Sequence, residues 1–168
     1  PANPSRILQA SIGADNRPPP PPGAAIPAAP GSVQSLPTAP PSAAPAPAPQ
    51  PSAGERIVSI AQSKIGSPYG WGAAGPNQFD CSGLMIYAFA GIGISLPHYS
   101  GYQYNIGKKV PLAEIKRGDL IFFGPNASQH EALYLGDNQM LEAPESGSTV
   151  KVSPLRTDGA MPMVVRLL

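Results

Sequence analysis

Cys81 is the only cysteine in this chain of 168 residues, and it lies within the stretch Phe79-Asp80-Cys81-Ser82-Gly83-Leu84. The reactivity of a free cysteine, more often than its packing, explains why it is retained. A thiolate beside a base is a strong nucleophile, whereas an intact thiol is a modest one. The alternative is a small buried residue at the start of a helix, because a lone cysteine is a weak signal. Nucleophilic catalysis is therefore one of two interpretations of this stretch.

A catalytic thiol needs a base, and the chain contains two histidines, His98 and His130. His98 lies in an expected loop at 96–100, whereas His130 lies at the start of an expected strand at 129–135. A strand holds a base more rigidly than a loop does, so we favour His130. For each histidine, a simple surface position is the alternative.

The third member of such a site orients the imidazole and stabilises its charged form, and the candidates are Glu142 and Glu145. Side chains alternate across a strand, so the loop length decides which acid shares a face with His130. A two-residue loop at 137–138 would oppose His130 to Glu145. A three-residue loop at 136–138, with Asn138 left-handed, would bring Glu142 onto the His130 face. A proline before Glu145 cannot donate to a ladder, so we favour Glu142.

The elements around Cys81 are expected to be helical. Asp80 is a good N-cap, and the apolar residues that follow recur at helical spacing as far as the glycines at 91 and 93. Cys81 should therefore lie in the first turn, where unpaired N–H groups and the helix dipole favour a thiolate. An amphipathic helix is expected at 55–65, and a loop at 68–78 should connect the two helices.

The pattern changes after residue 119 from helical spacing to short apolar runs. Strands are expected at 120–123, 129–135, 139–143, 149–152 and 163–167. Residues 96–109 read as a polar, tyrosine-rich connection. Helices followed by an antiparallel meander predict an α+β domain.

Composition divides the chain into two parts. Residues 1–53 hold 16 of the 24 prolines and only three charged residues, which predicts a Pro/Ala-rich spacer mostly without regular structure. Residues 54–168 read as one globular domain with nine basic and nine acidic residues, which gives no case for nucleic-acid or acidic-membrane binding. No run approaches the roughly 20 apolar residues of a membrane span.

The Pro/Ala-rich part has two interpretations. The first is a tether that holds the domain away from an anchor or partner. The second is self-inhibition, in which the short apolar cluster Ile7, Leu8 and Ile12 docks over the cleft that contains Cys81. The chain begins at Pro1 without an initiator Met or a signal-peptide core, which we interpret as a processed or truncated product.

Several motifs in residues 55–168, in combination and in this order, resemble those of the NlpC-type cell-wall cysteine peptidases, a papain-like family. More narrowly, they resemble the mycobacterial Rip-type peptidoglycan endopeptidases. The motifs are Pro68-Tyr69-Gly70-Trp71-Gly72, Phe79-Asp80-Cys81-Ser82-Gly83-Leu84, Leu96-Pro97-His98-Tyr99-Ser100-Gly101, Arg117-Gly118-Asp119-Leu120-Ile121-Phe122-Phe123, Ser128-Gln129-His130 and Tyr134-Leu135-Gly136-Asp137-Asn138-Gln139-Met140-Leu141-Glu142-Ala143-Pro144. They cover about two thirds of the chain and leave out the Pro/Ala-rich part.

The resemblance implies a papain-like fold, with N-terminal helices packed on an antiparallel sheet or half-barrel. It also implies roles for individual residues: Cys81 as nucleophile, His130 as base and Glu142 as the orienting residue. By the same resemblance, Tyr69 helps to form the oxyanion site. Asp80 and Ser82, which flank the nucleophile, contact the substrate.

The implied activity is hydrolysis of the bond between D-isoglutamate and meso-diaminopimelate in peptidoglycan stem peptides, for wall remodelling and daughter-cell separation. The resemblance further implies a secreted protein of the cell wall, with another cell-wall hydrolase as a candidate partner, and we expect a monomer. No metal is expected, because one cysteine and one strand histidine lack the spacing of metal ligands, and no other cofactor is expected. Two alternatives stay open: an amidase or acyltransferase with the same thiol chemistry, and a non-catalytic wall-binding module. One position departs from the family, because Glu131 replaces the usual apolar residue after the histidine. Because side chains alternate along a strand, Glu131 should point away from His130. If that face is buried, a lone carboxylate there destabilises the fold or has a shifted pKa.

Overall fold

A computed structural model describes residues 44–168, and Ala46–Leu168 form one unit. The predictions for the Pro/Ala-rich part, including docking of Ile7, Leu8 and Ile12, fall outside these residues. Residues 44–52 are exposed and lead into the first helix.

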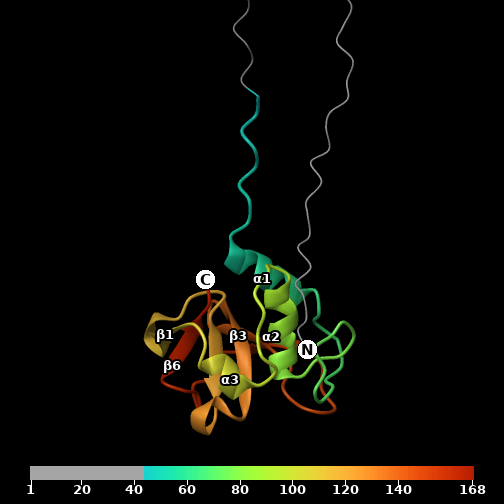
Figure 1. The fold of residues 1–168 in the computed structure, drawn as a ribbon, viewed down its shortest axis with the longest axis vertical. Helices are drawn as coiled ribbons and strands as arrows, with labels where there is room; N and C mark the ends of the chain where they lie inside the picture. The colour runs from blue at the N-terminus through green and yellow to red at the C-terminus, as the bar shows by residue number, and fades with distance from the viewer. Residues whose placement is uncertain (1–43) are drawn as a thin grey trace, which may run out of the picture. The chain divides into compact units, whose positions relative to one another are not determined.

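Three α-helices precede all six strands in the chain, and the fold is drawn in Figure 1. They are α1 (Ala53–Gln62), α2 (Cys81–Ala90) and α3 (Ser100–Tyr104). Ser52 caps α1, since its Oγ accepts a hydrogen bond of 3.2 Å from the Glu55 N–H. Helices α1 and α2 pack against each other, and α2 also contacts the sheet. Helix α3 lies within residues 96–109, for which the sequence predicts only a polar connection.

One six-stranded antiparallel sheet forms the rest of the domain, in the order β1-β6-β2-β3-β4-β5. The strands are β1 (Lys108–Pro111), β2 (Leu120–Phe123), β3 (His130–Gly136), β4 (Gln139–Glu142), β5 (Lys151–Pro154) and β6 (Met163–Arg166), and two 3-10 turns, η1 (Leu112–Glu114) and η2 (Pro125–Ala127), lie between them. Helices on an antiparallel sheet confirm the predicted fold class. Strand β1 was not expected, because it is an edge strand on which only Val110 is buried and its sequence shows little apolar alternation.

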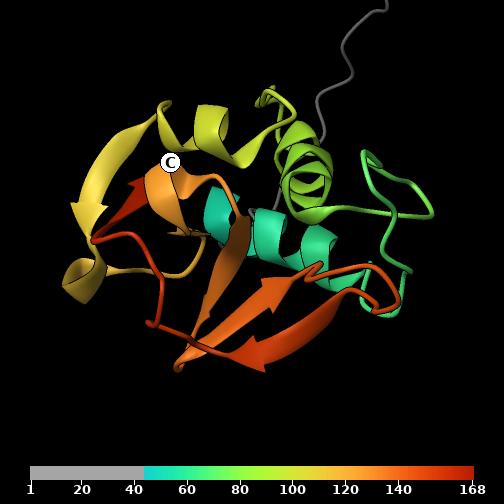
Figure 2. The same ribbon diagram turned by 90° about the horizontal axis from the view of Figure 1, so that it is seen from below.

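Both faces of the sheet are covered. On one face, α1 and α2 cover the sheet (Figure 2). The apolar cluster between them includes Phe122, Leu133 and Leu141. On the other face, a smaller cluster includes Phe123, Ala132 and Met140. Successive residues of a strand point to opposite faces, so all four residues of β2 are buried. Glu131, which pairs with Phe122 across β2 and β3, lies on the helix-covered face.

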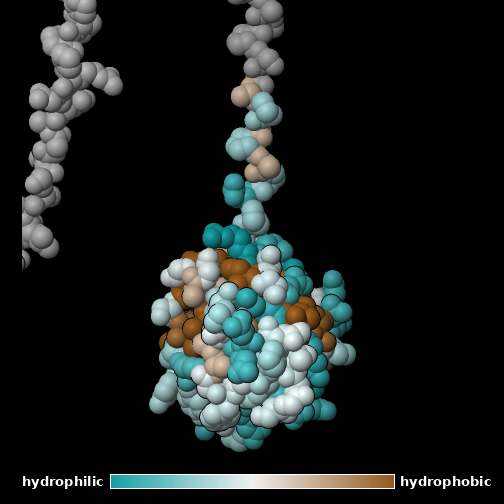
Figure 3. Space-filling model, turned by 90° about the vertical axis from the view of Figure 1, so that its right-hand side faces the viewer, coloured by the Kyte–Doolittle hydropathy of each residue, from teal (hydrophilic) through white to brown (hydrophobic). Residues whose placement is uncertain are grey.

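The exterior is mostly hydrophilic or neutral on the face shown in Figure 3, with hydrophobic patches in its upper half. Within residues 44–168, no helix combines the length and the apolar composition that crossing a bilayer would need.

Candidate active site

A cavity of about 310 Å³ lies where the start of α2 meets the start of β3. Its lining includes six of the residues singled out from the sequence, namely Tyr69, Asp80, Cys81, Ser82, His98 and His130. Glu142 lies behind His130 and lines a neighbouring hollow of about 370 Å³. The fold therefore brings candidates from loops, a helix and two strands to this cavity and the adjoining hollow.

Cys81 is the first residue of α2, as expected. The Asp80 side chain caps the helix, because its Oδ1 accepts a 2.6 Å hydrogen bond from the Gly83 N–H. Its Oδ2 accepts a 2.9 Å bond from the Gly72 N–H in the preceding loop. A Cβ on Gly83 would lie 1.9 Å from the carbonyl oxygen of Ala73, so glycine is needed where the helix meets this loop.

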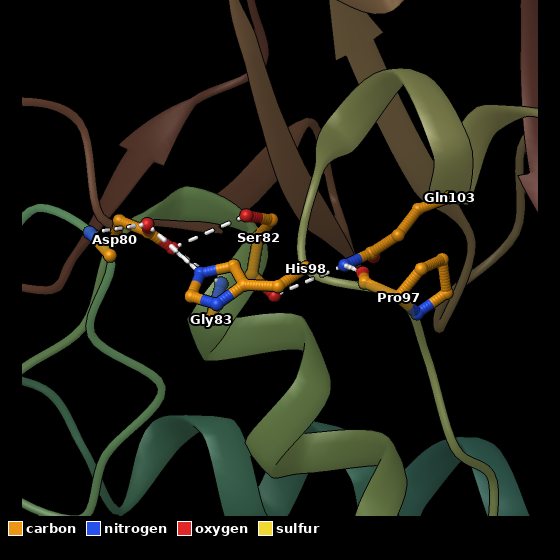
Figure 4. A network of polar contacts seen from close by, with 7 residues as sticks. Asp80, Ser82, Gly83, Pro97, His98 and Gln103 are labelled. Atoms are coloured by element: carbon orange, nitrogen blue, oxygen red, sulfur yellow. Dashed lines mark hydrogen bonds and ion pairs between the residues drawn. The ribbon is translucent and has the colours of Figure 1, made fainter.

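His98 lies on the Asp80 carboxylate. Its Nε2 is 2.9 and 3.0 Å from the two Asp80 oxygens (Figure 4). His98 also lines the same cavity as Cys81. The Ser82 hydroxyl also donates to Asp80, at 3.3 Å. His98 is thus part of the cap on α2, a position that its loop motif alone did not indicate.

Gln103 ties α3 to this region. Its Nε2 donates to the carbonyl oxygens of Ser82, at 3.2 Å, and of Pro97, at 2.9 Å (Figure 4). The buried amide therefore joins the first turn of α2 to the loop that carries His98. The sequence does not indicate this residue, because a glutamine in a polar segment carries no local signal.

Glu142 contacts the second histidine. Its Oε2 lies 2.7 Å from His130 Nε2, and the Glu142 side chain is 1% exposed. An ionised carboxylate only accepts hydrogen bonds, so an ionised Glu142 requires the proton on Nε2 and leaves the lone pair on Nδ1. Glu145, the rival candidate, is exposed.

The turn between β3 and β4 differs from the prediction. Gly136 pairs with Gln139, so the loop has two residues, Asp137 and Asn138, with φ of 51° and 53°. The expected loop had three residues, of which Asn138 alone was expected to be left-handed. By the sequence argument, a two-residue loop would have opposed Glu145 to His130.

A bulge in β3 restores the other register. The pairing shifts between Tyr134 and Gly136, so that Leu133 pairs with Leu141. The next pair in this register would be Ala132 and Glu142, which places Glu142 on the His130 face. The extra residue of the bulge compensates for the shorter loop, which local turn chemistry did not reveal.

Arg156 is a further member of the site that sequence analysis missed. Its Nη1 and Nη2 donate to the two Glu142 oxygens at 2.8 and 2.7 Å. Burial alone would raise the pKa of Glu142, but hydrogen bonds from Arg156 and His130 hold it well below its usual range. Arg156 follows β5 in an irregular segment, so only the tertiary structure brings it here.

The Cys81 thiol does not show the expected tendency to ionise. Burial raises the pKa of the thiol to about 12, and the negative charges of Glu131 and Asp80 act in the same direction. Backbone hydrogen bonds from Glu131 and Ser82 act against this rise without overcoming it. A thiolate at neutral pH therefore requires proton transfer to a base, because the helix N-terminus does not supply enough stabilisation.

Tyr69 keeps its phenolic proton. Burial raises the pKa of its hydroxyl, as do the neighbouring Cys81 and Asp80. The loop that carries Tyr69 is anchored at both ends of this pair of residues. The Tyr69 N–H donates to the Ser148 carbonyl oxygen, and the Gly70 N–H donates to the Phe79 carbonyl oxygen. Its hydroxyl is thus a hydrogen-bond donor on the wall of the cavity.

Glu131 lies on the helix-covered face, as its alternation with His130 predicts. It has no exposed surface, and neither carboxyl oxygen has a hydrogen-bond partner in the described part of the chain. Burial, followed by the charge of Asp80, raises the pKa of Glu131 well above its usual value. The expected consequence of an acid at this position is therefore confirmed.

The described residues contain no group of three or more His, Cys, Asp or Glu side chains arranged to hold a metal ion.

Comparison with known proteins identifies the family. The model of the NlpC/P60 family matches residues 66–168. Peptidoglycan endopeptidase RipA of Mycolicibacterium smegmatis is 57% identical over 127 residues, which are 68% of this chain and 26% of RipA. Peptidoglycan endopeptidase RipB of Mycobacterium tuberculosis is 50% identical over 127 residues, which are 68% of this chain and 53% of RipB. The chain thus spans only a quarter to a half of these relatives.

Two solved structures have the same fold. The peptidoglycan hydrolase RipB of M. tuberculosis matches with a TM-score of 0.66 and 49% identity, over 69% of this chain and 65% of that one. RipD of M. tuberculosis is described as a non-catalytic NlpC/p60 domain protein adapted to peptidoglycan binding. It matches with a TM-score of 0.65 and 41% identity, over 71% of this chain and 100% of that one. The chain belongs to the NlpC/P60 family.

Proposed function

We propose that this chain, as a member of the NlpC/P60 family, is a cysteine peptidase that hydrolyses amide bonds in peptidoglycan stem peptides outside the cell. One observation carries the proposal: Cys81 and His130 line one cavity, and Glu142 holds the His130 ring from behind. A nucleophile, a base and an orienting carboxylate are the parts that amide hydrolysis by a thiol requires.

The reaction begins with proton transfer from the Cys81 thiol to Nδ1 of His130. The thiolate attacks the carbonyl carbon, and the resulting oxyanion accepts hydrogen bonds from the Cys81 N–H and the Tyr69 hydroxyl. His130 then gives its proton to the leaving amine as the C–N bond breaks, which leaves a thioester on Cys81. The raised pKa of Tyr69 supports its role as a donor, since the hydroxyl stays protonated at working pH.

Hydrolysis of the thioester completes the cycle. His130 takes a proton from water, and the hydroxide adds to the thioester carbonyl. The C–S bond breaks, and the thiolate of Cys81 takes the proton back from His130. Glu142 stabilises the imidazolium in both halves of the reaction and remains ionised throughout.

The bond we propose is the one between D-isoglutamate and meso-diaminopimelate. The resemblance to RipA and RipB, which are peptidoglycan endopeptidases, supports this choice. Asp80 and Ser82, at the cavity wall beside the nucleophile, are the proposed substrate contacts. An amidase or acyltransferase would use the same thiol and differ in its product.

A non-catalytic, wall-binding function is the second candidate, because RipD, a homologue of similar fold, is described as non-catalytic. The presence of Cys81, His130 and Glu142 together in this chain favours catalysis over that alternative.

Mass analysis of muropeptides after incubation tests these functions together. We expect stem peptides cut before diaminopimelate, no cutting by the Cys81→Ala variant, and unchanged cutting in the presence of a chelator. Different products would support an amidase or acyltransferase, and bound but unaltered muropeptides would support the wall-binding module. Turnover by Cys81→Ala would disprove the thiol mechanism.

A further inference from the structure

We propose that Arg156 is a positioning residue that keeps Glu142 an acceptor-only carboxylate and so fixes the tautomer of His130. This inference rests on the proposed function, in which Nδ1 of His130 takes the proton of Cys81. Arg156 itself touches neither the thiol cavity nor the reacting bond, and it acts through Glu142.

The contact between Arg156 and Glu142 is bidentate. Arg156 places one nitrogen on each oxygen of the Glu142 carboxyl group, at 2.8 and 2.7 Å. Oε2 is shared, because it also accepts the 2.7 Å bond from His130 Nε2. The guanidinium group therefore holds the carboxyl plane in the orientation that meets the imidazole.

Burial makes this contact necessary. The Glu142 side chain is 1% exposed, so water cannot compensate its charge, and a buried carboxyl group without a cation would take up a proton. Besides Arg156, the carboxyl group contacts the His130 imidazole, whose charge changes with each proton transfer of the proposed reaction, whereas a guanidinium group always stays charged. Arg156 is thus the permanent counter-charge of Glu142.

The protonation state of Glu142 decides the tautomer of His130. A carboxylate can only accept, so it requires a proton on Nε2 and leaves the Nδ1 lone pair free for the thiol. A protonated Glu142 can donate to Nε2 instead, and the ring proton then moves to Nδ1. A ring in that state cannot take the proton of Cys81.

An aromatic ring supports the arrangement. The Phe123 ring lies 5.2 Å below the Arg156 guanidinium carbon and 5.6 Å from the His130 ring. The cation and the base therefore pack on the same side chain, which limits how either can move without the other.

The position of Arg156 makes it open to experiment. Its side chain is 46% exposed and lines the hollow behind His130, whereas Cys81 lies in the cavity in front. Lys151 lines the same hollow. Removal of the guanidinium would thus leave a space that a small solute can enter from outside.

The test uses Arg156→Met and Arg156→Lys in the full chain, with two matched controls. Arg166→Met breaks a similar bidentate contact away from the cavity, in which Nε and Nη2 of Arg166 donate to the two oxygens of the buried Asp119 at 2.8 and 2.7 Å. Lys151→Met removes a cation from the hollow itself. The readout is the pH profile of Cys81 alkylation by iodoacetamide, which needs no peptidoglycan.

For Arg156→Met we expect the acid limb of the profile to move to higher pH, by about one unit or more, because Glu142 then takes up a proton more readily. Hydrolysis of stem peptides should fall at least about tenfold, since a wrongly held tautomer costs more than that in a serine protease triad. Arg156→Lys should give values between those of the unaltered chain and Arg156→Met. Ethylguanidinium added to Arg156→Met should restore part of the lost hydrolysis. Neither Arg166→Met nor Lys151→Met should move the acid limb of the alkylation profile.

The tautomer itself is measured by nitrogen NMR of the two histidine rings in the Cys81→Ala background. We expect a proton on Nε2 of His130 with Arg156 present, and a shift towards Nδ1 in Arg156→Met. An acid limb that stays in place or moves to lower pH, or an unchanged tautomer, overturns the proposal. Failure of stem-peptide cleavage by the unaltered chain would instead overturn the proposed function and leave these two readouts intact.

Discussion

The buried carboxyl group of Glu131 lies close enough to Cys81 for its charge to raise the pKa of the thiol. Neither Glu131 oxygen has a hydrogen-bond partner within residues 44–168. An unpartnered acid next to a nucleophile is unfavourable for folding when ionised, and it is also unfavourable for thiolate formation. Both effects can be measured.

Replacement of Glu131 should stabilise the fold at neutral pH. Its folded-state pKa is raised, so the folded state binds more protons than the unfolded state above the unfolded-state value of 4.5, and stability falls as pH rises. Glu131→Val should therefore gain about 1–3 kcal/mol at pH 8, the usual cost of a buried polar group without a partner. The gain should shrink towards pH 4.5.

Urea unfolding of the unaltered chain, Glu131→Val and Glu131→Gln at several pH values checks this. Glu145→Gln, at an exposed position, is the control and should leave the curve in place. A difference between Glu131→Gln and the unaltered chain that does not vary with pH would contradict the assignment of a raised pKa.

Glu131 should also limit the thiol at alkaline pH. When Glu131 is neutral, Glu131→Gln changes no charge, so alkylation of Cys81 by iodoacetamide should proceed at the same rate in both proteins. Once Glu131 ionises, its charge raises the pKa of the thiol, so Glu131→Gln should react faster. Alkylation profiles that coincide over the whole pH range would show that Glu131 stays neutral or does not affect Cys81.

Loss of Glu142 should cost far more activity than loss of Glu145. Glu142 orients the His130 ring at 2.7 Å, so we expect Glu142→Ala to slow stem-peptide hydrolysis by about 100-fold or more. Glu145→Ala should stay within about twofold, as for exposed substitutions outside contact networks. Steady-state rates on purified muropeptides decide the matter, and equal losses would leave the orienting role unassigned.

Asp80 should combine a structural and an electrostatic effect that two substitutions separate. Asp80→Ala removes the cap on α2 and should lower stability by about 1–2 kcal/mol. Asp80→Asn keeps an acceptor for the Gly83 N–H but removes a charge that raises the pKa of Cys81, so its thiol should be alkylated faster at a given pH. Thermal unfolding and iodoacetamide rates measure the two effects. A slower reaction in Asp80→Asn would contradict this electrostatic account.

A fragment that starts at Pro51 should cleave stem peptides at the same rate as the full chain, because we interpret residues 1–53 as a spacer. A faster fragment would support self-inhibition instead. The fragment starts at Pro51 because Ser52 caps α1. A shorter fragment from Gly54 should be less stable by about 1 kcal/mol, which thermal unfolding can show.

The sequence alone was sufficient wherever the controlling interaction is local. Asp80 caps the helix that begins at Cys81 because the cap and the helix are adjacent in the chain. Alternation along β3 placed Glu131 on the face opposite to His130. It also limited the choice of orienting acid to two residues. Such features depend on the periodicity of helices and strands, which the order of residues expresses directly.

The tertiary structure decided what depends on distant residues and on burial. The bulge between Tyr134 and Gly136 compensates for a turn whose length was predicted wrongly, and Arg156 reaches Glu142 from beyond β5. The high pKa of Cys81 arises mainly from burial, against the effect of the helix N-terminus. None of these could be predicted from local pattern, because desolvation and contacts between distant segments exist only once the chain has packed.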